Sequence, residues 1–182
     1  MSAAITIAGP VFTVDGNIDT DTIIKSRHCT TAEPDLLAPH CLAEHRATPA
    51  FRPGGAYPLL CCSGTFGIGS ARIQAPLALA GAGVKAVIAR RFAPIFFENC
   101  INGALLLPFA AALDAWPGSG AHMTLRVSNG ALELCWDGER TVVPCALPEW
   151  VLTGRSWMDI IEEQARAVGG LELLRRRGVR LD

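Results

Sequence analysis

A glycine-rich stretch between a predicted strand and a predicted helix constrains this 182-residue chain most strongly. The stretch, from Gly64 to Arg72, has the sequence GTFGIGSAR. The apolar run at 57–62 before it is typical of a buried strand, and the alanine-rich run at 73–83 predicts a helix that ends at glycine. Glycine permits left-handed backbone angles and close approach to a ligand. The free amides of the first helical turn then favour an anion.

Two side chains in this stretch can carry chemistry. Ser70 offers an oxygen that can act as nucleophile or base, and Arg72 offers a forked cation for a carboxylate or phosphate. From the residues alone, the stretch predicts an anion site with a proton-transfer serine. A plain turn without a ligand is the alternative, because single glycine loops are common between a strand and a helix.

The composition is that of an ordinary globular protein. Half of the residues are hydrophobic, 18% are charged, and the formal net charge is −1. This balance argues against nucleic acid as a partner. No apolar run approaches the roughly 20 residues of a membrane-spanning helix, and the first residues do not resemble a signal peptide. We therefore expect a single domain over residues 1–182, a cytoplasmic location and no membrane partner.

The seven cysteines predict reduced thiols. Their number is odd and no Cys-x-x-Cys pair occurs, so we expect no disulfide framework and no zinc or iron–sulfur cluster held by this chain alone. Most are expected to be small apolar core residues. Cys29 is the exception, because it lies in a polar loop.

Strands and helices alternate through the first two thirds of the chain, and strands dominate the last third. We expect strands at 5–14, 57–62, 84–89 and 104–107, and helices at 35–46, 73–83 and 92–102. We expect a meander of strands at 123–127, 132–136 and 141–145, with Asn-Gly and Asp-Gly turns, and then a helix at 156–168. This order predicts an α/β fold, with a small parallel sheet, flanking helices, and a C-terminal β-meander and helix.

Three motifs, taken in order, resemble a known family. They are NIDTDTII at 17–24, FGIGSAR at 66–72 and KAVIARRFAPIFFENCINGALLLP at 85–108. They are similar to the small subunits of isopropylmalate isomerase and homoaconitase, the swivelling β/β/α domain of the aconitase superfamily. The resemblance extends from about residue 11 to residue 108.

The resemblance implies a two-chain hydro-lyase and isomerase that dehydrates a substituted malate and rehydrates the alkene, most like 3-isopropylmalate dehydratase of leucine biosynthesis. A [4Fe–4S] cluster would be bound by a separate large subunit, without which this chain would be inactive. Ser70 would be the base that removes a proton beside a carboxylate of the hydroxy-dicarboxylic acid substrate. Arg72 would hold a substrate carboxylate, and Asp21 would position catalytic groups, whereas Asp19 is expected to be a structural cap.

The resemblance also places a wider set of residues near the substrate: Gly69, Ala71, Thr20, Thr22, Arg27, His28, Cys29 and Thr30. The sequence departs from the family at three of the positions around Ser70. The family usually has Gly-Ser-Ser-Arg-Glu-His, whereas this chain has GSARIQ at 69–74. Ala71 thus lacks a hydroxyl, Ile73 lacks a carboxylate, and Gln74 cannot titrate.

Several functions remain open at this point. A homoaconitase-like or dimethylmalate-type dehydratase subunit is one alternative. Lys25 and Arg27 favour a third substrate carboxylate, whereas Cys29 and Ala32 favour an alkyl group. A non-catalytic regulatory or binding subunit is another alternative, which Ala71 and Ile73 favour. A phosphate-binding module rests on the glycine stretch alone.

Overall fold

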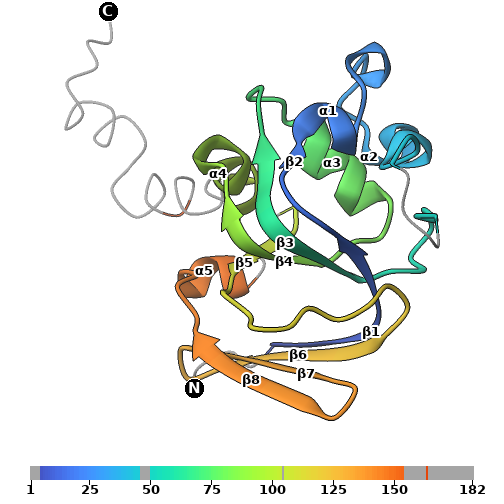
Figure 1. The fold of residues 1–182 in the computed structure, drawn as a ribbon. Coiled ribbons are helices and arrows are strands. Elements are labelled where there is room, and N and C mark those ends of the chain that lie inside the picture. The colour runs from blue at the N-terminus through green and yellow to red at the C-terminus, as the bar shows by residue number, and fades with distance from the viewer. Residues whose placement is uncertain (1–4, 46–49, 104, 154–162, 164–182) are drawn as a thin grey trace, which may run out of the picture.

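The computed structural model describes residues 5–45, 50–103, 105–153 and 163 (Figure 1). Its strands are β1 (Ile5–Val14), β2 (Ile18–Asp19), β3 (Leu59–Ile68), β4 (Ala86–Phe92), β5 (Leu107–Ala110), β6 (His122–Ser128), β7 (Ala131–Trp136) and β8 (Glu139–Pro144). Its α-helices are α1 (Thr20–Ile23), α2 (Pro34–Leu37), α3 (Gln74–Gly81), α4 (Pro94–Asn102) and α5 (Glu149–Leu152). Two 3₁₀ turns, η1 (Ser26–His28) and η2 (Ala38–His40), lie around α2.

The strands form one mixed sheet in the order β5-β4-β3-β1-β6-β7-β8, and β2 pairs with β3. Strands β5, β4, β3 and β1 are parallel, and β6, β7 and β8 continue from β1 as an antiparallel meander. Strand β1 joins the two parts, because Val11–Val14 pair with β3 and Ile5–Pro10 pair with β6. Gly9 lies at this change of partner, where a β-carbon would come within 2.5 Å of the Pro58 ring.

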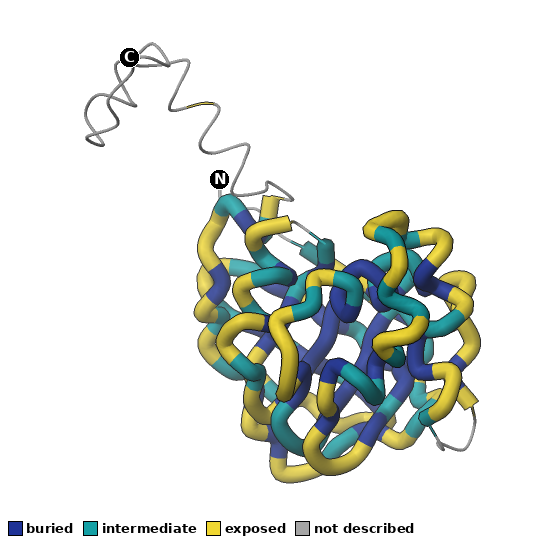
Figure 2. Tube along the Cα trace, turned by 90° about the horizontal axis from the view of Figure 1, so that it is seen from above, coloured by how far each residue is buried: buried dark blue, intermediate teal, exposed yellow. Residues whose placement is uncertain are grey.

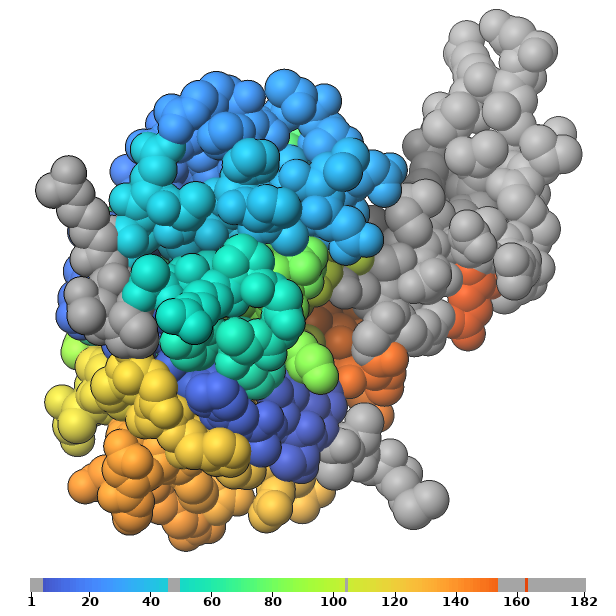
Figure 3. All heavy atoms as spheres, turned by 90° about the vertical axis from the view of Figure 1, so that its right-hand side faces the viewer, coloured from blue at the N-terminus to red at the C-terminus, as the bar shows by residue number. Residues whose placement is uncertain are grey.

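Apolar side chains fill both faces of the parallel strands. Leu60 and Cys62 of β3 belong to a cluster with the helical layer, whereas Leu59 and Cys61 belong to a cluster with the meander. All four are fully buried, and Figure 2 shows the same burial along the central strands. The molecule is thus layered, with the segment from α1 to α2 at one side and the meander at the opposite side (Figure 3). The predicted β/β/α architecture is confirmed.

The predicted start of the glycine loop was wrong. Strand β3 does not end at residue 62 but continues to Ile68, and Phe66 pairs with both Ile18 of β2 and Phe92 of β4. The glycines inside this extension make room for neighbouring protein. A β-carbon on Gly64 would lie 2.2 Å from the carbonyl oxygen of Gly16. The loop proper is therefore only 69–73.

Two other predicted elements differ from the structure. The helix expected at 35–46 is interrupted, because Pro39 has no amide hydrogen to continue the ladder; α2, η2 and a turn with Leu42 at φ 52° replace it. The strand expected at 104–107 begins at Leu107. Strand β2, α1 and α5 were not predicted. The helix expected at 156–168 lies outside the described residues, apart from Glu163.

Gly67 fixes the contact between β3 and α4, which makes it a sensitive test of the fold. Its φ is +81°, and a β-carbon would lie 2.2 Å from Cγ of the Phe96 ring. Gly67→Ala is expected to lower the free energy of unfolding by about 3 kcal/mol, from overpacking and a left-handed backbone together. Urea denaturation of the purified chain measures this loss.

The matched control is Gly130→Ala in the β6–β7 turn. Gly130 has a similar φ of +73° but nothing within 4 Å of the position of a β-carbon. Its replacement is expected to cost only the backbone strain, about 1 kcal/mol. Equal losses at the two glycines would contradict the packing argument.

Candidate active site

Ser70 lies on the exposed loop that follows β3, at the carboxyl edge of the parallel strands. Pairing of β2 with β3 brings the start of α1 to the same edge. The Thr20 hydroxyl oxygen lies 3.2 Å from Oγ of Ser70, although the two residues are 50 positions apart. Thr20 is a buried polar residue, with 2% of its surface exposed. A side chain held rigidly in the fold therefore contacts an accessible serine hydroxyl.

Asp19 fixes the orientation of α1. Its carboxylate accepts a hydrogen bond of 2.6 Å from the backbone amide of Thr22, the usual role of a residue that caps a helix. The expectation that Asp19 is a structural cap is confirmed. The next acidic residue, Asp21, lies in the first turn of α1 and makes side-chain contacts instead.

Asp21 and Arg72 form an ion pair beside Ser70. Nη1 of Arg72 donates to Oδ1 of Asp21 at 2.6 Å, and Oγ of Ser26 donates to the same oxygen at 3.0 Å. The hydrogen bond from Arg72, followed by that from Ser26, lowers the pKa of the Asp21 carboxyl below its ordinary value. The pair is therefore present above the ordinary pKa of aspartate and is lost as the pH falls through the lowered pKa.

Arg72 also has Cys29 nearby. The hydrogen bond to Asp21 is the main reason why the pKa of Arg72 is raised, and Cys29 makes a smaller contribution in the same direction. The thiol of Cys29 itself donates to the carbonyl oxygen of Lys25 at 3.6 Å. The structure thus brings Ser70, Thr20, Asp21, Arg72 and Cys29 to one place.

Arg27 and His28 make their contacts elsewhere. The Arg27 guanidinium forms an ion pair with Glu44, and its Nε donates to Nε2 of His28 at 3.2 Å. The His28 ring stacks on His40, with centroids 3.8 Å apart and planes within 7°. Burial, followed by the charges of His40 and Arg27, lowers the pKa of His28. The contacts of these two side chains are with residues 40–44 and not with Ser70 or Arg72.

The other predicted substrate contacts are less defined. Thr22 is half-buried beside its cap, and Thr30 and Ala71 are exposed. Gly69 has a φ of +103°, and a β-carbon there would lie 3.4 Å from the Thr20 hydroxyl. Glycine at 69 therefore allows the loop to turn close to Thr20. Ser26 was missed, although its place in a polar loop five residues after Asp21 could have suggested it.

The start of α3 offers fewer free amides than the sequence suggested. The Arg72 amide donates to the Ser70 carbonyl at 2.8 Å, and the Ala75 amide reaches the Arg72 carbonyl at 3.4 Å. Pro76 has no amide hydrogen. An anion at this point would thus depend on the Arg72 side chain more than on the helix.

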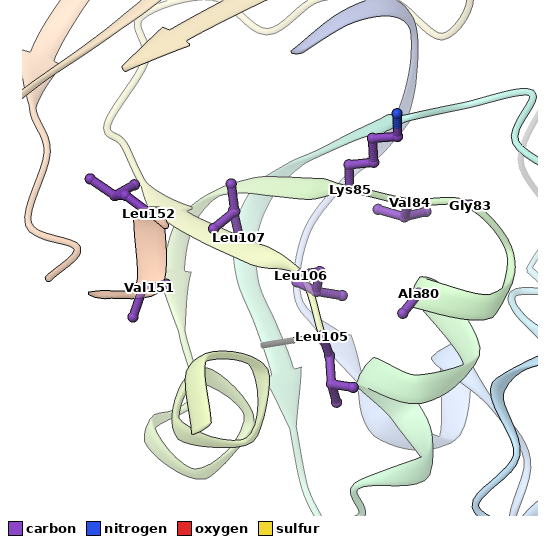
Figure 4. A pocket seen from close by; sticks show the side chains of 9 residues that line it. All are labelled: Ala80, Gly83, Val84, Lys85, Leu105, Leu106, Leu107, Val151 and Leu152. Carbon is purple, nitrogen blue, oxygen red and sulfur yellow. The ribbon is translucent and has the colours of Figure 1, made fainter. Parts of the chain in front are cut away.

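A separate cavity lies near the other end of α3 (Figure 4). Its volume is about 350 Å³, and its lining includes Ala80, Val84 and Leu106 together with Val151 of α5. Neither Ser70, Asp21 nor Arg72 lines it. This apolar cavity is distinct from the candidate active site.

The cysteines lie apart from one another or deep in the core. Within the residues that the structure describes, no three His, Cys, Asp or Glu side chains are placed to hold a metal ion. All seven cysteines are unpaired. Burial raises the pKa of the Cys41, Cys61 and Cys100 thiols far above the ordinary range, and that of Cys62 to about 11. No helix in the described ranges is long and apolar enough to cross a membrane.

The class of the protein follows from this arrangement and from a family match. Residues 47–112 match the model of the aconitase C-terminal domain. The matched segment contains β3, α3, β4 and α4 with the loop that carries Ser70 and Arg72. Over this segment, which includes Ser70 and Arg72, the chain is therefore similar to the aconitase C-terminal domain.

Curated relatives identify the family. A 3-isopropylmalate dehydratase small subunit 1 of Methanopyrus kandleri is 33% identical over 178 residues, which cover 96% of this chain and 95% of the relative. A 3-isopropylmalate dehydratase small subunit of Syntrophus aciditrophicus is 37% identical over 69% of this chain and 76% of the relative. One from Metallosphaera sedula is 44% identical, and the match spans 62% of that relative, less than two thirds of its length.

A solved structure agrees with these sequences. The crystal structure of a 3-isopropylmalate dehydratase from Methanocaldococcus jannaschii superposes with a TM-score of 0.76 at 26% identity, and covers 90% of this chain and 97% of that one. The chain belongs to the family of 3-isopropylmalate dehydratase small subunits. The resemblance predicted from the three motifs is confirmed.

Proposed function

We propose that this chain is the small subunit of a hydro-lyase that dehydrates and rehydrates an alkyl-substituted malate, with 3-isopropylmalate as its substrate. One observation carries the proposal. This chain, which belongs to the family, has Ser70 and Arg72 on one loop at an exposed edge, where Ser70 contacts Thr20 and Arg72 contacts Asp21. A proton acceptor and a carboxylate-binding cation are what dehydration of a hydroxy acid requires from this side of a site.

Ser70 is the base in this proposal. Its oxygen takes the proton from the carbon beside a substrate carboxylate, and the electrons of that C–H bond form the alkene as hydroxide leaves the neighbouring carbon. A neutral serine hydroxyl is too weak a base for this step, so the oxygen acts as the alkoxide, whose negative charge the site has to stabilise. The Thr20 hydroxyl at 3.2 Å can donate to it, and Arg72, two residues further along the same loop, supplies a positive charge beside Asp21.

Arg72 binds the substrate carboxylate. Guanidinium has five N–H donors in a fixed fork, and Asp21 accepts from Nη1. The remaining donors can bind a carboxylate on another side. Asp21 keeps the guanidinium in one orientation, which makes it a positioning residue.

An alkyl group suits the surroundings of Ser70 better than a third carboxylate. Of the two cations that could bind such a carboxylate, Lys25 and Arg27, Arg27 is paired with Glu44. Ile68, just before the Ser70 loop, and Ile73, at the end of that loop, are both exposed. Ile73 also replaces a carboxylate usual in the family, so the departure makes the site more apolar. These features support an alkylmalate over a homoaconitase-type substrate.

A substrate panel tests this choice. Alkene formation is measured with both chains present and with 3-isopropylmalate, homocitrate or dimethylmalate as substrate. The highest kcat/KM is expected for 3-isopropylmalate. Preference for homocitrate would contradict the alkyl proposal, and a stable complex inactive on all three would favour a regulatory subunit.

We assign the [4Fe–4S] cluster of the reaction to the large subunit. The cysteines of this chain do not fit such a cluster, because the described residues contain no metal-binding group of three and four of the thiols are buried with raised pKa values. The exposed position of Ser70 fits a site completed by a second chain.

The large subunit covers the carboxyl edge of the parallel strands in this proposal. Five large hydrophobic side chains are markedly exposed among the described residues, and Ile68, Ile73 and Ile95 belong to this edge. The Ala93 amide, just before α4, donates to the Phe66 carbonyl at 2.9 Å, so Ile95 lies on the helix beside the end of β3. An open hollow of about 340 Å³, lined in part by Phe92, Pro94 and Phe97, adjoins it. Exposed apolar surface of this kind marks protein interfaces.

Replacing Ile95 tests the position of the interface. Ile95→Asp is expected to weaken binding to the large subunit by roughly 10-fold to 100-fold, because it places a charge in a desolvated contact. Titration calorimetry of the two purified chains measures the dissociation constant. Val142→Asp is the matched control, since Val142 is similarly exposed but lies on β8. Weakening by Val142→Asp alone would place the partner on the meander instead.

A further inference from the structure

Ser26 shares its acceptor with Arg72. Oδ1 of Asp21 receives the Ser26 hydroxyl at 3.0 Å and Nη1 of Arg72 at 2.6 Å. The Ser26 hydroxyl thus connects the loop after α1 to the ion pair of Asp21 and Arg72. Hydrogen bonds from both donors favour the ionised form of Asp21.

The shared Oδ1 atom of Asp21 affects how many N–H donors of Arg72 stay free for a substrate carboxylate. A carboxylate that rotates freely tends to form two parallel hydrogen bonds with a guanidinium. Such a pairing would take two of the donors that a substrate carboxylate needs. Oδ1 of Asp21 accepts from the Ser26 hydroxyl as well as from Nη1 of Arg72, and this second hydrogen bond restricts the rotation of the Asp21 carboxylate.

The turn that carries Ser26 is itself braced. The amides of His28 and Cys29 donate to the carbonyls of Lys25 and Ser26 at 2.9 and 3.0 Å, which forms η1. Arg27 binds Glu44, and the His28 ring stacks on His40. Arg27 and His28, which the family resemblance predicted to lie near the substrate, thus brace the turn that carries Ser26.

We propose that Ser26 is a positioning residue for substrate binding, which holds the Asp21 carboxylate so that Arg72 keeps free donors for the substrate. The inference rests on the proposed function of Arg72 as the carboxylate clamp. Ser26 does not contact the reacting atoms and acts through Asp21. Its loss therefore changes substrate affinity more than the rate of the chemical step.

The first test uses the complex of the chain with its large subunit. Ser26→Ala is expected to raise KM about fivefold and to leave kcat within about twofold, since one hydrogen bond to a charged group is lost. Ser26→Thr, which keeps a hydroxyl, is expected to restore KM. Thr31→Ala is the matched control, because the Thr31 hydroxyl lies in the same loop but accepts from the Glu33 amide at 3.1 Å.

The second test does not need activity. In the isolated full chain, a carbon-13 NMR titration of the Asp21 carboxyl is expected to show a higher pKa in Ser26→Ala and no change in Thr31→Ala. An unchanged Asp21 titration would overturn the inference whatever the kinetics. A fall in kcat with KM unchanged would overturn it too. If the wild-type complex were inactive, the proposed function would fail, and the titration would still decide whether Ser26 holds Asp21.

Discussion

Replacing Ser70 with alanine is expected to lower alkene formation by the two-chain enzyme at least about 1000-fold, with little change in KM. The hydroxyl oxygen is the proposed proton acceptor, and alanine has no atom to replace it. The loss would appear in kcat because the oxygen acts at the proton-transfer step. Initial rates at saturating 3-isopropylmalate measure it.

Two controls separate this chemical effect from a change of fold. Ser70 is exposed in the isolated chain, so Ser70→Ala is expected to leave the thermal unfolding midpoint of that chain nearly unchanged. Ser63→Ala removes the same atom from β3, where the hydroxyl bonds the Gly16 amide and the Asp15 carboxylate. Its kcat is expected to stay near that of the wild type. A Ser70→Ala enzyme within tenfold of the wild type would contradict the role of Ser70 as base.

Replacing Arg72 is the second large expected effect. Arg72→Lys is expected to lower kcat/KM about 100-fold, mainly through KM, because one ammonium group cannot bind Asp21 and a substrate carboxylate with the geometry of the fork. Arg72→Ala is expected to lower it about 1000-fold, since the positive charge near the Ser70 oxygen is lost as well.

Steady-state kinetics of the two Arg72 variants separate the effect of the lost binding geometry from the effect of the lost positive charge. Arg140→Lys is the control, because Arg140 also donates to a carboxylate, that of Glu133, but lies on β8 in the meander. It is expected to leave kcat/KM unchanged. An Arg72→Lys enzyme with wild-type KM would show that the substrate carboxylate is bound elsewhere.

The layers of the fold could be predicted from local patterns, whereas some boundaries could not. Alternating apolar residues and the Asn-Gly and Asp-Gly turns predicted the meander closely. The extension of β3 to Ile68 was hidden by Gly64 and Gly67, because glycine suggests a loop when the neighbouring backbone that requires it is not known. The break in the helix predicted at 35–46 could have been anticipated, because Pro39 lies inside that range and has no amide hydrogen for a helical hydrogen bond.

The candidate site depended on the resemblance more than on spacing. Thr20 and Ser70 meet only because the two-residue strand β2 pairs with the end of β3, and so short a strand has no detectable periodicity. The contacts of Arg27 and His28 with residues 40–44 likewise depend on how the chain folds back after α2. The catalytic roles of Ser70, Arg72 and Asp21 remain predictions.

The central claim is that this chain supplies the base to a site that a large subunit completes. The most direct measurement is alkene formation from 3-isopropylmalate as the purified chain is added to a fixed amount of its iron–sulfur-loaded large subunit. We predict no activity from either chain alone and a rate that rises with added chain until it saturates. Full activity of the large subunit alone, or a rate indifferent to the added chain, would contradict the account.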